Sequence, residues 1–191
     1  LSEEDAFETL EQSLPYKHLI KAVGLDSSEK GNPPSKFQKV FEASVKEGYI
    51  PVAHAGEEGP TEYIWEALDL LKIARIDHGN NCLTDEVLVK RLVDEKIALT
   101  VCPLSNLELK VVDVLKDHPL KKMLNLGLKA TVNSDDPAYF GGYMNANFLQ
   151  TAEALDLTQE EIKTLVKNSF EYSLLSDDEK QKYLIQVENF E

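Results

Sequence analysis

The sequence is poor in cysteine and in basic residues. Its 191 residues include 2 cysteines, and 20 Lys and Arg residues stand against 34 Asp and Glu residues, which gives a net charge of −14. Two cysteines are too few for the disulfide framework of a small secreted protein, so we expect a reducing, cytoplasmic environment. Nucleic acids and anionic membranes bind basic surfaces, so this acidic composition argues against both as partners.

Long apolar runs and phosphate-binding glycine motifs are also absent. No apolar run approaches the roughly 20 residues of a membrane span, and the opening residues, LSEEDAFETL, do not have the pattern of a signal peptide. Neither GxGxxG nor GxxxxGK[ST] occurs, which disfavours a nucleotide-phosphate site. Hydrophobic residues nevertheless make up 42% of the chain, which is enough to form a folded core.

The sequence does contain an alternation of short β-like segments and longer helical ones. The predicted strands cover 22–26, 50–54, 74–78, 98–102 and 130–134. The predicted helices cover 35–47, 61–71, 85–95, 120–126, 145–154, 158–172 and 177–189, with Thr84 as the expected N-cap of the third. Strands that alternate with helices predict a parallel sheet with crossover helices, hence an α/β fold that forms one domain over 1–191.

Each predicted strand ends at a polar or ionisable residue. These residues are Asp26, His54, His78, Cys102 and Asp135. They are separated by 28, 24, 24 and 33 residues, each about the length of one strand–helix unit. Because the carboxyl ends of parallel strands share one rim, where ligands bind in α/β proteins, the sequence predicts a ligand site there.

Two of these strand ends carry histidine. In His54-Ala-Gly-Glu57, a small-residue turn separates an imidazole from a carboxylate, and Asp77-His78-Gly79 ends the next strand. A neutral imidazole is a good zinc ligand, and a nearby carboxylic acid can transfer a proton. Taken singly, each motif is more often a loop charge or a structural histidine. Two histidines at adjacent strand ends make a functional site an equally good explanation.

Paired carboxylates follow the last predicted strand, in Asn133-Ser134-Asp135-Asp136-Pro137. Asp before Pro commonly starts a helix, with Asp as the N-cap and Pro at the first helical position. Alternatively, Asp135 binds a metal or shares a proton while Asp136 hydrogen-bonds substrate, because neighbouring carboxylates push their pKa values apart. The two explanations are compatible. Of the other candidates, Cys102 is expected to be a small buried residue, and His18 and His118 to lie on the surface.

Four motifs together, in this order, resemble the adenosine/adenine deaminase family of zinc-dependent aminohydrolases. They are HAGEEGP (54–60), RIDHG (75–79), LTVCPLSN (99–106) and NSDDPAYFGGY (133–143), and GLDSSEKGNPPSKF (24–37) extends the match. The segments DSSE and NSDDPAYFGGY are similar to the adenine deaminase branch. The resemblance implies a metal-dependent (β/α)₈ barrel of the TIM type. This chain would be its C-terminal part, with the N-terminal strands missing and a helical C-terminal extension.

The resemblance also implies an activity and a role for five residues. The activity is the hydrolytic deamination of adenine to hypoxanthine and ammonia in purine salvage, with zinc supplying hydroxide at neutral pH. By position, His54 and Asp135 match zinc ligands, and Glu57 matches the acid that protonates the purine ring at N1. His78 matches the imidazole that orients the attacking water, and Asp136 the carboxylate near N7. The loop over 24–29 is expected to line the base pocket.

One motif of the family is absent from the sequence. The family's zinc site also uses an H-x-H pair, but the four histidines here, at 18, 54, 78 and 118, include no such pair. Five strand ends are found where a barrel needs eight. We therefore expect a fragment with an incomplete zinc site and weak or no activity, which homo-oligomerises to cover exposed sheet edges.

Three alternatives to adenine deamination stay open. The substrate is adenosine or an N6-substituted adenine, or the chain is a non-catalytic, oligomerising partial barrel. In the third, the chain belongs to a metal-free barrel enzyme that uses Asp135 and Asp136 as acid and base.

Overall fold

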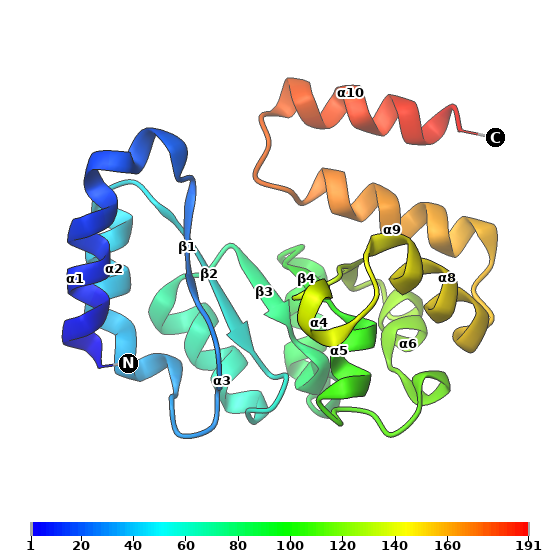
Figure 1. Cartoon of the computed structure of the whole chain (residues 1–191), viewed down its shortest axis with the longest axis horizontal. Coiled ribbons are helices and arrows are strands. Elements are labelled where there is room, and N and C mark those ends of the chain that lie inside the picture. Colours follow the sequence, from blue (N-terminus) through cyan, green and yellow to red (C-terminus); the bar gives the residue numbers. More distant parts are fainter. Residues whose placement is uncertain (1, 191) are drawn as a thin grey trace. The chain divides into compact units, whose positions relative to one another are not determined.

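The computed structural model describes residues 2–190, which form two compact units (Figure 1). The first unit ends at Leu88 and the second begins at Val89. The prediction of a single domain over 1–191 stays a prediction. Among the described residues, no helix is both long and apolar enough to cross a membrane.

The first unit contains three parallel strands. They are β1 (Ala22–Leu25), β2 (Ile50–Ala55) and β3 (Arg75–His78). Strand β1 pairs with β2, with Ala22 opposite Ile50, and β2 pairs with β3, with Val52 opposite Arg75. The helical elements are α1 (Glu3–Ser13), η1 (Leu14–Leu19), η2 (Pro34–Phe37), α2 (Gln38–Lys46), α3 (Thr61–Glu66), the π turn η3 (Ala67–Leu71) and η4 (Asn80–Thr84). Each strand lies within one or two residues of its predicted range.

The core of the first unit lies between the strands and their helices. Helices α1 and α2 run side by side in Figure 1, and α2 buries Val40 and Phe41. Strand β2 is buried along most of its length, including Val52 and Ala55. This burial on both faces is expected of a strand in a parallel sheet covered by crossover helices.

The second unit contains two parallel strands. They are β4 (Ala98–Val101) and β5 (Lys129–Val132), with Ala98 opposite Lys129. Helix α4 (Glu86–Asp94) contains the boundary between the units. The helical elements that follow are α5 (Pro103–Glu108), η5 (Leu115–Asp117), α6 (Leu120–Asn125), α7 (Pro137–Phe140), α8 (Met144–Leu155), α9 (Gln159–Glu171) and α10 (Asp177–Glu188). In both units the strands that pair are parallel, which confirms the predicted α/β class.

The chain ends in helices, as predicted. Helix α9 begins with a capping box between Thr158 and Glu161, in which each side chain bonds the backbone N–H of the other residue. Helix α10 packs against α9 (Figure 1). The rings of Phe170 and Tyr183 stack with their centroids 4.8 Å apart. None of the residues described in α10 is buried.

The predicted N-cap of α4 is wrong by one residue. The carboxylate of Asp85 accepts hydrogen bonds from the backbone N–H groups of Val87 and Leu88, at 2.9 and 3.1 Å. Thr84 instead bonds the carbonyl of Asn81 and the hydroxyl of Thr61. The indole N–H of Trp65 also donates to Asp85, and this bond together with the backbone N–H donors lowers the pKa of the Asp85 carboxyl group.

Candidate functional site

His54 lies near the end of β2, beside the end of β1. Its Nδ1 atom is 3.2 Å from the carbonyl oxygen of Leu25, and its Nε2 atom is 3.3 Å from a carboxylate oxygen of Asp26. Because a carbonyl only accepts, Nδ1 carries the proton in the neutral ring, which leaves Nε2 as the unprotonated nitrogen. Histidines that bind zinc through one ring nitrogen commonly donate the N–H of the other to a backbone carbonyl, and the Nδ1 contact of His54 fits this pattern.

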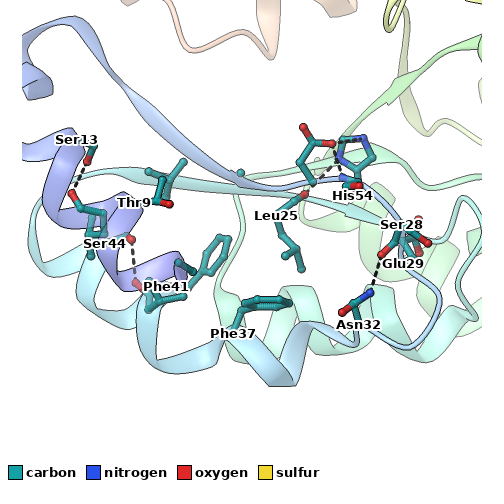
Figure 2. Close-up of a pocket in the computed structure, with 17 residues that line it drawn as sticks. Thr9, Ser13, Leu25, Ser28, Glu29, Asn32, Phe37, Phe41, Ser44 and His54 are labelled. Carbon is teal, nitrogen blue, oxygen red and sulfur yellow. Dashed lines mark hydrogen bonds and ion pairs between the residues drawn. The ribbon is translucent and has the colours of Figure 1, made fainter. Parts of the chain in front are cut away.

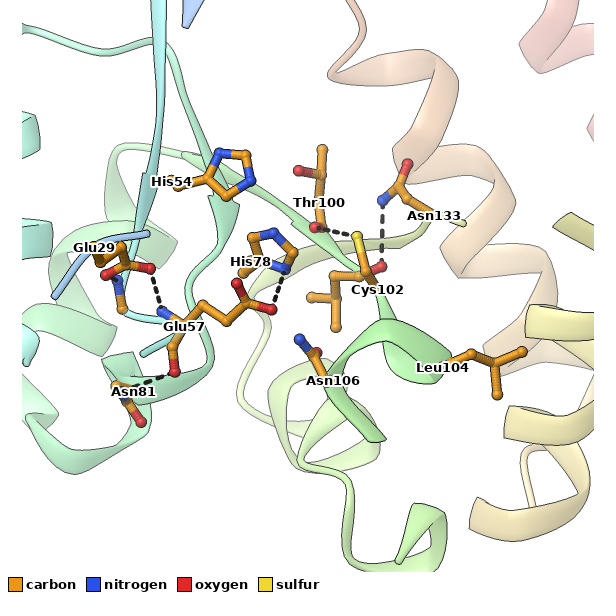
Figure 3. A network of polar contacts seen from close by, with 12 residues as sticks. Glu29, His54, Glu57, His78, Asn81, Thr100, Cys102, Leu104, Asn106 and Asn133 are labelled. Carbon is orange, nitrogen blue, oxygen red and sulfur yellow. Dashed lines mark hydrogen bonds and ion pairs between the residues drawn. The ribbon is translucent and has the colours of Figure 1, made fainter. Parts of the chain in front are cut away.

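Glu57 and His78 form a buried pair in the same unit. The carboxylate of Glu57 is 3.1 Å from Nδ1 of His78, and the exposed fractions of these residues are 9% and 2% (Figure 3). The rings of His54 and His78 have centroids 4.7 Å apart. The structure therefore brings together three of the five predicted site residues: His54, Glu57 and His78.

The backbone at His78 is in an unusual conformation. Its φ angle is +66°, in the left-handed region, and Asp135 in the second unit has φ +54°. Residues other than glycine adopt this region at an energetic cost, and such strain is concentrated at functional positions. Residue type gives only a weak signal for it, because histidine and aspartate adopt this region more often than most residues other than glycine.

The loop between β2 and α3 is held by a carboxylate that the sequence reasoning missed. Glu29, 5% exposed, accepts backbone hydrogen bonds from Gly56 at 2.8 Å, Glu57 at 2.8 Å and Gly59 at 3.0 Å (Figure 3). On the carbonyl side of the loop, the amide of Asn81 donates to the carbonyls of Gly59 at 2.8 Å and Glu57 at 3.4 Å. The backbone that carries Glu57 is thus bonded through both its N–H and its C=O groups.

A cavity of about 430 Å³ lies within the first unit, between α1, α2 and the segment after β1 (Figure 2). Residues 24–29 and His54 line one part of it, and apolar side chains such as Leu10, Phe37 and Phe41 line another. The loop over 24–29 therefore lines a cavity. Its assignment to the base pocket stays a prediction.

The two predicted aspartates lie in the second unit, after β5. Asp135 is half-buried and Asp136 is exposed. Asp136 occupies the N-cap position of α7 with Pro137 directly after it, as the Asp-Pro motif predicts, although within the described residues its side chain makes no capping hydrogen bond. The preceding Asn133 donates from its amide to the Thr131 hydroxyl at 2.7 Å and to the carbonyl of Val101 at 3.4 Å, which ties the end of β5 to β4.

Buried side-chain amides hold the segments around these strand ends. Asn147, fully buried in α8, accepts from the backbone N–H of Leu104 at 3.2 Å and donates to the carbonyl of Gly142 at 2.8 Å. Cys102 is buried, as predicted, and its thiol lies 3.4 Å from the carbonyl of Thr100 (Figure 3). The amide of Asn147 therefore bridges α5 and the loop that follows α7.

The prediction that His118 lies on the surface is wrong. Its side chain is 3% exposed, its Nδ1 accepts from the backbone N–H of Leu120 at 3.1 Å, and its Nε2 lies 3.2 Å from the amide oxygen of Asn106. Burial lowers the pKa of His118 to about 4, so the ring is neutral at pH 7. The charged residues beside it in the sequence suggested exposure, and tertiary packing overrides them. His18 is exposed, as predicted.

Parallel strands joined by helices, with imidazole and carboxylate groups at their carboxyl ends, define the α/β class to which TIM-type barrel enzymes belong. Within that class, the chain belongs to the adenosine deaminase family, because the family model described as "Adenosine deaminase" matches residues 2–190. The chain is 61% identical over 187 residues to an adenine deaminase of Acinetobacter baylyi, covering 98% of this chain and 56% of the relative. It is 57% identical over 190 residues to an adenine deaminase of Hahella chejuensis, covering 100% and 57%.

The solved structures agree with the family match. An adenine deaminase from Arthrobacter aurescens superposes with a TM-score of 0.96 at 50% identity, covering 98% of this chain and 57% of that one. An amidohydrolase from Burkholderia ambifaria, solved with bound zinc, superposes with a TM-score of 0.92 at 24% identity, covering 98% and 53%, and shows the fold alone. The predicted family, its adenine deaminase branch and the partial barrel are confirmed. The chain spans about half the length of the curated relatives it matches.

Proposed function

We propose that this chain is part of a zinc-dependent adenine deaminase, a cytoplasmic enzyme of purine salvage, and that it carries the acid of the active site. The observation that carries the proposal is the buried contact of 3.1 Å between Glu57 and His78, beside the imidazole of His54. Relatives at 57–61% identity that are named adenine deaminases support adenine as the substrate. The overall reaction adds water to adenine and releases ammonia and hypoxanthine.

Zinc would be held by Nε2 of His54 and by the carboxylate of Asp135. The proton on Nδ1 of His54, donated to the carbonyl of Leu25, leaves Nε2 as the ligand atom. Zinc, when bound, supplies a Lewis acid that makes water nucleophilic near neutral pH. A catalytic zinc generally has at least three protein ligands, and the sequence contains no H-x-H pair. We propose that the remaining ligands come from the part of the relatives that this chain does not cover.

Glu57 is the proposed general acid. In its protonated form, its carboxyl group donates to N1 of the purine, which draws electrons from C6 and makes C6 open to attack by water. Glu57 is only 9% exposed, and the exclusion of water strengthens the hydrogen bond between its carboxyl group and N1 of the purine. The imidazole of His78, whose Nδ1 atom lies 3.1 Å from the Glu57 carboxylate, is the proposed group that orients the attacking water. The exposed carboxylate of Asp136 bonds the imidazole portion of the base near N7.

The test uses two proteins: the 191-residue chain, and a chimera in which the uncovered part of the Acinetobacter baylyi relative precedes it. Each is given adenine, adenosine and N6-methyladenine, and hypoxanthine or inosine is quantified by chromatography. We expect the chimera to convert adenine to hypoxanthine at ordinary enzyme rates. Conversion of adenosine or N6-methyladenine in preference to adenine would overturn the assignment of the substrate.

The chain by itself is expected to bind zinc weakly, to have little or no activity and to form homo-oligomers that cover its sheet edges. Elemental analysis and size-exclusion mass measure these properties. Stoichiometric zinc together with ordinary turnover in the chain alone would contradict the proposal that its site is incomplete. An inactive chimera that forms defined oligomers would instead favour the non-catalytic alternative.

A further inference from the structure

We propose that Glu29 is a positioning residue for Glu57: its buried carboxylate fixes the backbone of residues 56–59, and so the point from which the side chain of Glu57 reaches His78. This inference rests on the proposed function for its catalytic consequence. The positional claim itself depends only on hydrogen bonds within the first unit.

Both oxygens of the Glu29 carboxylate accept backbone hydrogen bonds. One oxygen of Glu29 accepts from Gly56 at 2.8 Å and from Gly59 at 3.0 Å, and the other accepts from Glu57 at 2.8 Å. Successive backbone N–H groups that converge on one anion form a nest, in which the turn and the anion stabilise each other. With Glu29 only 5% exposed, little water is available to replace the carboxylate as acceptor.

Glu57 makes contacts through both its backbone and its side chain. Its N–H is bonded to Glu29, its C=O lies 3.4 Å from the amide of Asn81, and its carboxylate is 3.1 Å from His78. The two backbone contacts fix where the side chain starts, and its far end lies against the His78 imidazole. A shift of the loop would therefore move the carboxyl group relative to His78.

Two glycines in the loop leave no room for a side chain. A Cβ atom on Gly59 would lie 2.3 Å from the Glu29 oxygen and 2.6 Å from the ring of Tyr63. Gly56 has φ +76°, and a Cβ atom there would lie 2.5 Å from Ile64. Only glycine fits at these two positions, at Gly59 because the loop approaches Glu29 and Tyr63, and at Gly56 because of its positive φ and the Ile64 side chain.

The first unit contains a second carboxylate that serves as a control. Asp85 is another carboxylate that accepts three N–H bonds, from Trp65, Val87 and Leu88. Its donors belong to α3 and the start of α4, not to residues 56–59. Glu29→Gln and Asp85→Asn each replace a carboxylate by an amide of the same shape and turn an N–H donor toward N–H donors. We expect both variants to lose some stability, but only Glu29→Gln to displace the loop over 56–59.

The first measurement is amide hydrogen exchange by NMR on the 191-residue chain. In Glu29→Gln we expect exchange at Gly56, Glu57 and Gly59 to accelerate about 10-fold relative to the rest of the first unit, the effect of one lost hydrogen bond. Asp85→Asn should leave these three amides unchanged and accelerate Val87 and Leu88. Glu29→Asp keeps the charge but withdraws it by one methylene, so it should accelerate the same three amides if Glu29→Gln does not fold.

The second measurement is the kinetics of the chimera with adenine. We expect Glu29→Gln to lower kcat about 100-fold with KM within about twofold, because a displaced acid weakens the transition state more than substrate binding. Asp85→Asn should change neither by more than about twofold. Unchanged exchange at the three amides, or a kcat no lower than that of Asp85→Asn, would overturn the proposal. A wild-type chimera inactive on adenine would refute the proposed function, while the exchange experiment would still decide whether Glu29 fixes the loop.

Discussion

The two units hold the segments after their strands with different chemistry. In the first unit Glu29 gathers the backbone N–H groups of the loop, the Asn81 amide bonds carbonyls of that loop, and a second carboxylate, Glu57, contacts the His78 imidazole. In the second unit neutral amides do this work: Asn133 bonds β4 and β5, and Asn147 bonds α5 and the loop after α7. A carboxylate only accepts, so it suits a turn that presents N–H groups, whereas an amide can join an N–H group to a C=O group.

The buried ionisable side chains of the two units also have different roles. In the first unit the buried titratable groups Glu29, Glu57 and His78 lie in or beside the proposed proton-transfer site. In the second, the buried histidine His118 is kept neutral and serves as a hydrogen-bonding group.

Removal of the first unit's proposed metal ligand should have the largest effect. In the chimera, His54→Ala should lower the zinc content at limiting zinc by well over 10-fold, because loss of a ligand weakens binding more than the roughly 10–100-fold cost of losing an outer-shell partner. Elemental analysis after dialysis measures this. His18→Ala, which removes an exposed histidine, should leave the zinc content unchanged. Equal zinc in the two variants would remove His54 from the site.

Replacement of a buried amide by a carboxylate should destabilise the second unit. Asn147→Asp places a buried negative charge against the carbonyls of Gly142 and Tyr143 and removes two donors. We expect the free energy of unfolding to fall by about 3 kcal/mol, in the range for an uncompensated buried charge. Urea titration measures the change.

Asn32→Asp is the control for this exchange. The exposed amide of Asn32 also donates to two carbonyls, those of Ser28 and Lys30, but water can replace it there. Its cost should be below about 0.5 kcal/mol. Similar costs for Asn147→Asp and Asn32→Asp would show that burial of the amide is not what makes it necessary.

The neutral state of His118 predicts a pH dependence of stability. The pKa of His118 is about 4 in the folded protein against an ordinary value of 6.5, so between these values the unfolded state binds a proton that the folded state does not. Stability is therefore lost as pH falls through this window. Between pH 7 and pH 5 we expect a loss of about 2 kcal/mol from this residue.

The measurement is the free energy of unfolding in urea across that pH range. His118→Gln should remove this part of the pH slope, and His18→Gln should keep it, because His18 is exposed. A slope that is the same in wild type and His118→Gln would contradict the assignment.

The corrected helix cap gives the smallest effect. Asp85→Ala should destabilise the protein by about 1 kcal/mol, the usual cost of a lost N-cap, whereas Thr84→Ala should cost less. Thermal unfolding of the two variants compares them. A larger cost for Thr84→Ala would restore Thr84 as the cap of α4.

The fold and part of the site could be predicted because their signals are local. The runs that became β2 and β4 are short and mainly apolar, and the Asp-Pro pair marked the start of α7. His54 and Glu57 were found because their order along the chain is a family motif. These features depend on neighbours within a few residues.

The features that escaped prediction depend on distant partners. Glu29 stands among Ser28, Lys30 and other polar residues, and only the loop about 27 positions later buries it. His118 lies beside Asp117 and Lys116, yet packing against Asn106 makes it a buried, neutral group. The positive φ angle of His78 was not predicted either, because histidine only modestly favours the left-handed region.

The most direct test of the account is the rate of hypoxanthine formation from adenine by the chimera carrying Glu57→Gln or Glu58→Gln. The two variants make the same chemical change at adjacent positions, one at the buried partner of His78 and the other at an exposed carboxylate paired with Lys30. We predict that Glu57→Gln lowers kcat by about 10²–10⁴-fold, the range for a lost general acid, and that Glu58→Gln changes it less than about twofold. Undiminished turnover in Glu57→Gln would contradict the proposed acid.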